Sequence, residues 1–345
     1  MKVHKDIFER LIAPENLFTA WEEFRRGKQS RKDVMQFEER LEQNLFQLHR
    51  ELRDGTYSHG SYSAFTICDP KQRRIHKATV RDRIVHHAVF SVLNPIFEPT
   101  FIAHSFSCRK EKGTHKAVAA LERMLWQISK NHQRQCFALK CDIHQFFASV
   151  DHTILLGFLK RKIKDERTMR LLERIVGSFT TSPRGTGIPI GNLTSQLFAN
   201  IYLNEFDQFM KNDLHIRHFV RYTDDFVVLA EDKDALEKMI PLIRAYLQDS
   251  LRLDLHPRKV SIRTYRQGID FLGYVLRPHH RLIRTRTKRR MFRKFRMRME
   301  EHARGIGSTE SVQQSLQSYL GVLSHADAHQ LGQALQNQYG LWVQE

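Results

Sequence analysis

The chain has 345 residues, 41% of them hydrophobic, and its 56 Lys and Arg against 38 Asp and Glu give a net charge of +18. This hydrophobic content excludes a disordered chain, and the length allows one large domain or two to three packed lobes. The positive excess predicts a polyanionic partner, with nucleic acid first and an anionic membrane surface second.

The four cysteines form no C-x-x-C pair, which excludes an encoded zinc ribbon or dithiol redox motif and fits a reducing compartment. No stretch approaches the roughly 20 apolar residues that a membrane span requires. We therefore expect a soluble, cytoplasmic protein without a membrane partner.

Helix-type and strand-type patterns alternate along the chain. A first helix, over 36–52, has its apolar side chains on one face and ends at Asp54-Gly55. Two short strands over 63–77 follow around a turn at Asp69-Pro70, and then a helix over 80–97 that closes near Asn94-Pro95. Next come a strand that ends near Asp142, a helix over 152–163 capped by Asp151 or Thr153, and a helix over 193–210 capped by Asn192. The last elements are strands over 215–222 and 226–230, a helix over 232–251 with Pro241 inside it, short strands over 259–265 and 269–278, and a very basic helical tail. Interspersed helices and antiparallel hairpins predict an α+β fold rather than a doubly wound sheet.

Two adjacent acids, Asp224 and Asp225, separate two of the predicted strands. An isolated acidic pair is ordinarily a solvated hairpin turn. Here an uninterrupted apolar run, 226–229, follows the pair, as in a strand covered on both faces. Carboxylates brought together at the mouth of a buried sheet repel one another unless a cation neutralises them, and Mg²⁺ is the economical one.

A third acid, Asp142, ends another apolar strand, and only the fold decides whether it meets the pair. If it does, the set can hold two Mg²⁺ ions, one activating a 3′-hydroxyl and one steadying a leaving pyrophosphate. The basic segment 281–298, interleaved with Phe292 and Phe295, predicts a surface that follows phosphates while its rings stack on bases or are buried. A merely solvated basic helix is the alternative.

From about residue 60 to 340, the chain carries a series of motifs that resemble those of reverse transcriptases and follow the same order. The segments that carry the resemblance are PKQRRI, VRDRIVHHAV, SFSCRKEKGTHKAV, KCDIHQFFASVDH, GIPIGNLTSQLFANIYLN, RYTDDF, HPRKV and FLGY. The segment from Ile190 to Gln196 has the I-G-x-x-x-S-Q form that resembles the reverse transcriptases of diversity-generating retroelements. Thr223 stands where many relatives have Met or Ala.

The resemblance implies a right-hand polymerase fold. Its parts here are an N-terminal helical extension over 1–60, fingers with part of the palm over 61–135, the palm over 136–278, and a short basic helical thumb over 279–345. It also implies an RNA-directed DNA polymerase that copies a template-repeat RNA into cDNA with errors mainly opposite adenine. The mutated cDNA would then replace part of a target gene in a retrohoming-type process that diversifies its sequence. The implied partners are dNTPs, the RNA/cDNA duplex, two Mg²⁺ ions and a small basic oligomeric accessory variability protein. Alternatives are a retron-type or abortive-infection reverse transcriptase without adenine-biased errors, and a catalytically silent RNA-binding scaffold.

The resemblance assigns roles to individual positions. The implied catalytic residues are Asp142, Asp224 and Asp225, with Ile143 completing the metal set. The implied dNTP-binding residues are Lys71, Arg73, Phe147, Ile190, Gly191 and Lys259. The implied template and primer contacts are Gln196, Tyr222, Phe271, Leu272, Gly273, Tyr274, Arg289, Arg290 and Arg293.

Several of these positions have alternative interpretations. Phe147 is either a steric gate against the ribose 2′-hydroxyl or a core residue, and the segment 271–274 is either a primer grip or plain core. Ile190 replaces a Gln of more accurate relatives, so we predict that it contributes to error-proneness. His325 and His329, four apart on a predicted helix, favour packing or RNA contact over a metal site, since no third ligand accompanies them.

Overall fold

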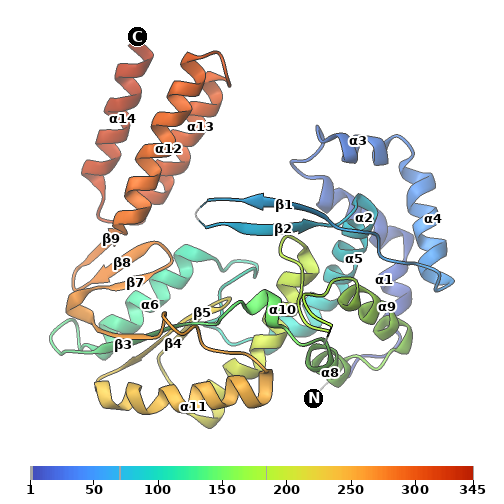
Figure 1. The fold of residues 1–345 in the computed structure, drawn as a ribbon, viewed down its shortest axis with the longest axis horizontal. Helices are drawn as coiled ribbons and strands as arrows, with labels where there is room; N and C mark the ends of the chain where they lie inside the picture. The colour runs from blue at the N-terminus through green and yellow to red at the C-terminus, as the bar shows by residue number, and fades with distance from the viewer. Residues whose placement is uncertain (1–2, 70, 184, 345) are drawn as a thin grey trace.

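The computed structural model describes residues 3–69, 71–183 and 185–344. Helices and antiparallel strands are interspersed, which confirms the mixed fold (Figure 1). The strands are β1 (Ser63–Ile67), β2 (Arg73–Lys77), β3 (Phe137–Asp142), β4 (Phe219–Tyr222), β5 (Asp225–Ala230), β6 (Ser261–Thr264), β7 (Ile269–Phe271), β8 (Tyr274–Arg277) and β9 (His280–Ile283).

The helices surround these strands. They are α1 (Phe8–Ile12), α2 (Pro14–Arg25), α3 (Lys32–Glu38), α4 (Leu41–Arg53), α5 (Val80–Phe97), α6 (Thr114–Ile128), α7 (Phe146–Ser149), α8 (His152–Lys162), α9 (Glu166–Gly177), α10 (Leu193–Gln208), α11 (Lys233–Leu251), α12 (Thr285–Ala303), α13 (Thr309–Leu323) and α14 (His329–Gln344). Short irregular helices are η1 (Glu98–Thr100), η2 (Phe209–Asp213) and η3 (Tyr265–Gln267). No helix in the described part of the chain combines the length and apolar character needed to cross a membrane.

The central sheet has the strand order β4-β5-β3-β6, and β3, β4 and β5 are mostly buried, whereas the edge strand β6 is partly exposed. Phe226 and Val228 of β5 point into the larger core, beside α10 and α11, whereas Val227 and Leu229 pack with α6 and the sheet β7-β8-β9. This alternation explains why β5 is an uninterrupted apolar run, because each successive side chain enters a different hydrophobic layer.

The N-terminal helices α1–α4 pack around α5 and form the blue region of Figure 1. Trp21 of α2 is fully buried there, and its ring stacks on Phe37 of α3 at a centroid separation of 5.3 Å. The short helices α1–α4 thus bury their apolar faces against the long helix α5. Together they form the base from which the hairpin β1-β2, which precedes α5, extends.

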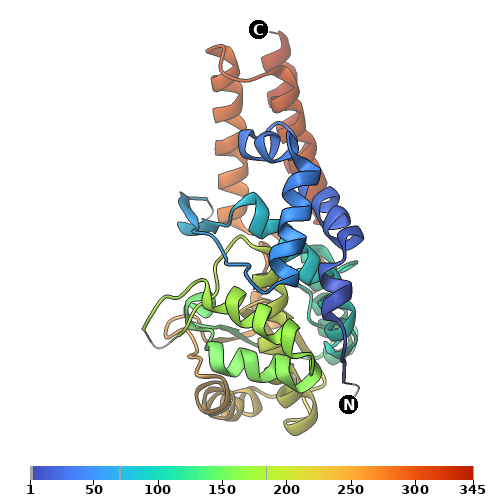
Figure 2. The ribbon, with the colours of Figure 1, turned by 90° about the vertical axis from the view of Figure 1, so that its right-hand side faces the viewer.

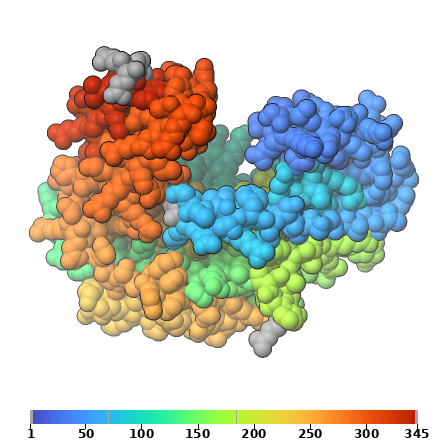
Figure 3. All heavy atoms as spheres, turned by 45° about the horizontal axis from the view of Figure 1, so that its top comes forward, coloured from blue at the N-terminus to red at the C-terminus, as the bar shows by residue number. Residues whose placement is uncertain are grey.

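The C-terminal helices α12–α14 pack on one another and project away from the N-terminus (Figure 2). Met291, Phe295 and Met299 of α12 are buried against the other two helices, so the basic side chains lie on its outer faces. Figure 3 shows a deep hollow between these helices and the N-terminal helices, with the tip of the β1-β2 hairpin against α12. There Asp69 forms an ion pair with Lys294, and Arg290 lies 3.8 Å away.

Several elements differ from the sequence prediction. The helix predicted over 36–52 is split into α3 and α4, whereas α5 covers the predicted range 80–97 with Pro95 inside it. Asn192 flanks α10 without capping it, since its side-chain amide donates to the His76 carbonyl at 2.9 Å instead. Strand β9 was not predicted as a separate strand. Pro70, in the predicted hairpin turn, lies outside the described residues.

Candidate active site

The register of the central sheet brings the predicted catalytic carboxylates together. β3 and β5 pair antiparallel, so that Asp142 lies directly opposite Asp225. The Ile143 N–H donates to the Asp224 carbonyl at 3.1 Å, which joins the two strand ends. Opposite residues of an antiparallel pair project to the same face, so Asp142 and Asp225 share the face covered by α6 and the β7-β8-β9 sheet.

The turn between β4 and β5 consists of Thr223 and Asp224, because Tyr222 pairs with Asp225. Thr223 has a φ of 53°, a conformation that is unfavourable for a β-branched residue. Its hydroxyl donates to Ser107 Oγ at 2.6 Å and helps to hold this conformation. The Thr223 side chain is therefore part of the support of the acidic turn.

A fully buried ion pair lies beneath the same turn. Arg221 and Asp207 are both 0% exposed, and the guanidinium donates two bonds to the carboxylate, at 2.7 and 2.5 Å. Arg221 also donates to the Thr223 carbonyl at 3.1 Å and to Ser105 Oγ at 3.0 Å. Burial raises the pKa of Asp207, and the bidentate bond from Arg221 opposes that rise. The pair connects α10 to the strained residue of the turn.

Burial and mutual repulsion disfavour ionisation of the acidic pair. Burial is the largest cause that raises the pKa of Asp224, followed by the charge of Asp142, while Lys259 and Arg73 act in the opposite direction. Burial also raises the pKa of Asp225 to about 6, against the attraction of Lys140. These carboxylates lack sufficient positive charge around them, so a cation is the expected complement.

Two lysines partly supply that charge. Lys259 Nζ lies 2.8 Å from Asp142 Oδ1, and Lys140 Nζ lies 3.5 Å from Asp225 Oδ2. The other oxygen of Asp225, Oδ1, is buried without a hydrogen-bond partner among the described residues.

The carboxylates suit a metal site that substrate and water complete, rather than one built from protein ligands alone. Over the described ranges, no group of three or more His, Cys, Asp or Glu side chains is placed to hold a metal ion by itself. Mg²⁺ uses one or two carboxylates together with substrate phosphates and water rather than a cage made of protein alone. The strand-end carboxylates fit this requirement. The Ile143 side chain is buried, so only its backbone is available to a ligand.

The β1-β2 hairpin docks onto the loop before α10. The His76 N–H donates to the Ile190 carbonyl at 3.0 Å. Gly191 has a φ of 112°, and a Cβ on it would lie only 2.7 Å from Ile75 Cγ2, so only glycine fits there. Arg73 begins β2, close enough for its charge to act on Asp224, whereas Lys71 is exposed in the hairpin turn.

Phe147 lies on the short helix α7 rather than on extended backbone. Phe146 is 1% exposed and belongs to the core, whereas Phe147 is half-buried. The Phe147 carbonyl accepts a bond from the Ile188 N–H at 2.8 Å, which fixes α7 against the loop that contains Ile190. Phe147 therefore keeps a partly accessible ring beside the strand end.

The predicted template and primer contacts fall into two groups. Phe271 and Tyr274 are buried in the core between α6 and the β7-β8-β9 sheet, while Leu272 and Gly273 form the turn between β7 and β8 at positive φ. Exposed or half-exposed positions among the remaining predicted contacts are Gln196, Tyr222, Arg289, Arg290 and Arg293. Only this second group and the turn have accessible side chains or backbone, and within the group Arg290 lies beside Asp69.

His325 and His329 do not share a helix. His325 lies in the connection between α13 and α14, and its ring centroid is 3.7 Å from that of His115 on α6. Phe295 is fully buried and Phe292 is partly buried in the C-terminal helices, so both pack there rather than stacking on bases. The packing interpretation of His325 agrees with this contact.

Sequence reasoning missed Lys140, Arg221 and Asp207. Lys140 stands two residues before Asp142 on the same strand and hence on the same face, and it also donates to the Asp270 carbonyl at 2.8 Å. Arg221 is a charged residue inside the otherwise apolar strand β4. A charged residue within an apolar strand was the available signal in both cases.

Strand-end carboxylates with basic side chains around them are the arrangement of a metal-dependent enzyme that handles phosphate-bearing substrates. The chain belongs to the reverse transcriptase (RNA-dependent DNA polymerase) family, whose profile matches residues 68–276. It is 29% identical over 261 residues to Protein YkfC of Escherichia coli, covering 63% of this chain and 65% of that protein. It is 24% identical over 306 residues to the Group II intron-encoded protein LtrA of Lactococcus lactis, covering 68% and 50%. The chain thus spans about half to two thirds of these relatives.

Proposed function

We propose that this protein is an RNA-directed DNA polymerase that extends a primer on an RNA template with dNTPs. The observation that carries the proposal is the strand register that sets Asp142 opposite Asp225, with Asp224 in the adjoining turn. Family membership over residues 68–276 supports the same activity.

Asp142, Asp224, Asp225 and the backbone of Ile143 would hold two Mg²⁺ ions. The chemistry that these ions supply is activation of the primer 3′-hydroxyl and neutralisation of charge on the leaving pyrophosphate. Ionised carboxylates are required for this role, and burial raises the pKa of Asp225 to about 6, so that this carboxyl group is still mostly ionised at neutral pH.

The surrounding side chains bind and orient the nucleotide. Arg73 would contact the triphosphate with its planar guanidinium, while Lys259 supplies positive charge beside Asp142. Ile190 and Gly191 would line the base-pair pocket, and the absent Cβ of Gly191 lets Ile75 of β2 pack against this loop. Leu272 and Gly273, at the β7-β8 turn, would contact the primer strand, and α12 would follow the duplex phosphates through Arg289 and Arg293.

Phe147 would select deoxyribonucleotides by clashing with a ribose 2′-hydroxyl. We expect Phe147→Ala to increase ribonucleotide incorporation about 10- to 100-fold relative to dNTPs, because one steric contact is worth roughly 1–3 kcal/mol. Single-nucleotide extension with matched dNTP and rNTP measures this ratio. Phe209→Ala, at another half-buried Phe that packs against Tyr246, is the matched control. Unchanged sugar selectivity in Phe147→Ala would assign the ring to the core alone.

We further propose that the enzyme makes error-prone cDNA from a template-repeat RNA, assisted by a small basic accessory variability protein. The I-G-x-x-x-S-Q form of the loop at Ile190 supports this, since an apolar side chain replaces a hydrogen-bonding one beside the nascent base pair. We expect Ile190→Gln to lower misincorporation opposite template adenine about tenfold, which sequencing of the cDNA would measure. An unchanged error spectrum would remove Ile190 from the explanation.

A second candidate is an accurate reverse transcriptase of the group II intron type. The similarity to the Group II intron-encoded protein LtrA favours it. Primer extension on an RNA template with dNTPs and Mg²⁺, followed by cDNA sequencing, separates the candidates. Errors concentrated opposite adenines support the error-prone enzyme, and few or evenly scattered errors support the accurate one. Asp224→Asn is the control for metal-dependent extension, and an RNA-binding scaffold would be left if the wild type makes no product.

A further inference from the structure

The ammonium group of Lys140 connects two sheets next to the acidic pair. It donates to the Asp270 carbonyl at 2.8 Å and lies 3.5 Å from Asp225 Oδ2. Lys140 is on β3 of the central sheet, whereas Asp270 is on β7 of the sheet β7-β8-β9, and apolar side chains fill the core between these sheets. One side chain therefore ties a proposed metal ligand to the backbone of the neighbouring sheet.

Two carboxylates at this junction need positive charge. Asp225 Oδ1 and Asp270 Oδ1 are both buried without a hydrogen-bond partner among the described residues. A buried carboxylate is costly unless a cation compensates it. Lys140 lies beside Asp225, and Arg284 Nε lies 2.8 Å from the other oxygen of Asp270, Oδ2. The charges that they compensate therefore help to hold Lys140 and Arg284 in place.

Asp270 stands two residues before the turn between β7 and β8. Its neighbours Ile269 and Phe271 are 2% and 0% exposed, so close packing restricts this strand. The turn that follows, Leu272-Gly273, is the segment proposed to contact the primer strand. The position of Asp270 thus sets the position of the turn.

The same turn is also held from the C-terminal helices. Arg284 directly precedes α12, and its N–H donates to the Gly273 carbonyl at 3.0 Å. Because its guanidinium also pairs with Asp270, Arg284 contacts both ends of the segment 270–273. Lys140 holds this segment from the catalytic sheet, and Arg284 holds it from the start of α12. Loss of either cation would therefore free one side of the turn.

We propose that Lys140 and Arg284 are positioning residues that hold the β7-β8 turn, and with it the primer 3′ end, in register with Asp225. The proposal rests on the RNA-directed DNA polymerase activity proposed above and on the primer contact of the turn. Neither cation touches the substrate in this role, because each acts through Asp225, Asp270 or Gly273. The placement matters because a misplacement of about 1 Å between reacting groups can slow a reaction about a hundredfold.

Primer extension measured together with primer-template affinity tests this role. We expect Lys140→Met, which keeps a long side chain but removes the ammonium group, to lower kcat about 10- to 100-fold. The dissociation constant of the primer-template, measured without dNTPs, should change by less than about threefold, because Lys140 positions the primer end rather than binding it. Lys140→Arg should recover most of the rate, since a guanidinium can donate to a carbonyl and a carboxylate together.

A double variant tests whether the two cations act on the same turn. The slowing in Lys140→Met/Arg284→Met should be smaller than the product of the two single fold-changes, because residues of one network do not act additively and a turn that one loss has displaced has less left to lose. A slowing equal to that product would mean that the cations act independently, and it would overturn the shared role.

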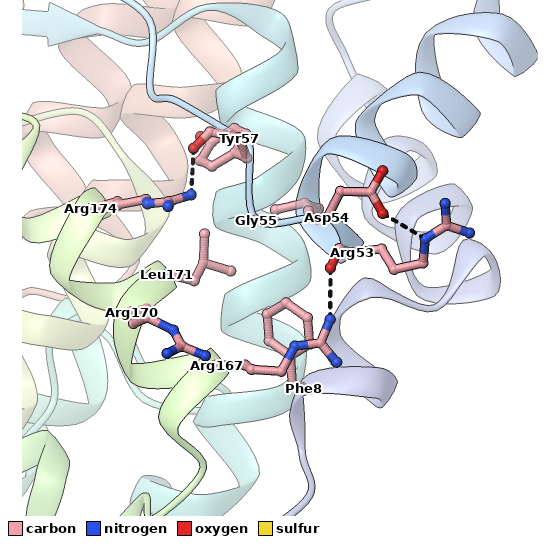
Figure 4. A pocket seen from close by; sticks show the side chains of 10 residues that line it. Phe8, Arg53, Asp54, Gly55, Tyr57, Arg167, Arg170, Leu171 and Arg174 are labelled. Atoms are coloured by element: carbon pink, nitrogen blue, oxygen red, sulfur yellow. Dashed lines mark hydrogen bonds and ion pairs between the residues drawn. The ribbon is translucent and has the colours of Figure 1, made fainter.

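Two controls separate positioning from a mere loss of charge or of a hydrogen bond. Arg263→Met removes a positive charge from the pocket of about 210 Å³ that Lys140 and Arg284 also line, and the Arg263 side chain has no ion pair or hydrogen bond within the described part of the chain. Arg174→Met removes a bond of equal length, 2.8 Å, from α9 to the Tyr57 carbonyl, in a pocket across the molecule from β7 (Figures 1 and 4). Both variants should keep kcat within about twofold of the wild type.

Hydrogen exchange of the free protein tests the positioning without catalysis. In Lys140→Met, amides of the segment 269–276 should exchange at least about threefold faster than in the wild type, whereas the two controls should leave them unchanged. If the wild type makes no product, the polymerase proposal fails while this measurement still decides whether Lys140 holds the turn. Unchanged exchange in Lys140→Met would overturn the proposal. So would a wild-type kcat in this variant, or a primer-template affinity that falls as much as kcat.

Discussion

Two ion pairs of the same chemical kind occupy opposite environments in this molecule. Arg221 and Asp207 are completely buried beneath the acidic turn, with every other polar contact of the guanidinium satisfied. Lys294 and Asp69 join α12 to the tip of the β1-β2 hairpin, where their side chains are 44% and 34% exposed. The first pair lies in the rigid core of the site, and the second pair bridges two elements on either side of the hollow.

The comparison shows that burial, rather than charge, decides what an ion pair does. A buried pair cannot separate without leaving a desolvated charge, so it holds the Thr223 carbonyl and the turn in one position. An exposed pair is weakened by water and salt, and it contributes at most about 1 kcal/mol. The buried pair therefore fixes the support of the active-site turn, whereas the exposed pair holds the hairpin against α12 only weakly.

The largest expected effect follows removal of the buried arginine. Arg221→Ala leaves Asp207 buried without a partner, and we expect the free energy of unfolding to fall by about 3–5 kcal/mol. Denaturant unfolding measures this value. The double variant Arg221→Met/Asp207→Leu should recover most of the stability, because apolar residues of similar volume replace buried ion pairs well.

The same double variant tests the positioning role. Without the bond from Arg221 to the Thr223 carbonyl, we expect primer extension to remain at least tenfold slower even though stability returns, because small misplacements of catalytic groups are costly. The Mg²⁺ concentration for half-maximal rate should rise in parallel. Wild-type extension in the stable double variant would show that the pair serves folding alone.

An intermediate effect is expected at the acidic pair itself. The pKa of Asp225 is raised to about 6, so the folded protein binds a proton more tightly than the unfolded chain between pH 4 and 6. Without metal, stability should therefore decrease as pH rises through this window. At pH 7, Asp225→Asn should be more stable than wild type by about 1–3 kcal/mol.

Unfolding in EDTA at pH 4 and pH 7 measures this difference. The gap between Asp225→Asn and wild type should be present at pH 7 and should nearly vanish at pH 4. Asp249→Asn, at an exposed carboxylate of α11, is the control and should show no gap. Equal stability of Asp225→Asn and wild type at pH 7 would contradict the strained charge inferred for the site.

The smallest effect is expected at the exposed pair. Asp69→Ala should change the free energy of unfolding by less than about 1 kcal/mol. Asp69→Lys, which places like charges beside Lys294 and Arg290, should increase the separation of hairpin and α12, and Lys294→Asp should restore it. Fluorescence energy transfer between labels on the two elements reports the separation. If the distance between the labels stayed the same in both variants, other contacts would hold the hairpin in place.

Much of the site could be predicted from sequence because its signals are local. Adjacent acids beside a continuous apolar run indicated a buried strand, and β5 has this burial on both faces. The requirement for glycine at position 191 comes instead from the distant β1-β2 hairpin, because a Cβ there would lie 2.7 Å from Ile75 Cγ2. The cap at Asp151 also formed, whereas the expected cap at Asn192 was replaced by a contact with His76 from a segment more than a hundred residues away.

By itself, the sequence determined the elements of the sheet, the acidic residues at the strand ends and the family motifs, because these depend on neighbours along the chain. Only the tertiary structure decided that Asp142 pairs with Asp225, that Lys140 and Lys259 contact the carboxylates, and that Arg221 is buried on Asp207. Strand register and desolvation depend on how distant segments pack, and no local pattern encodes them.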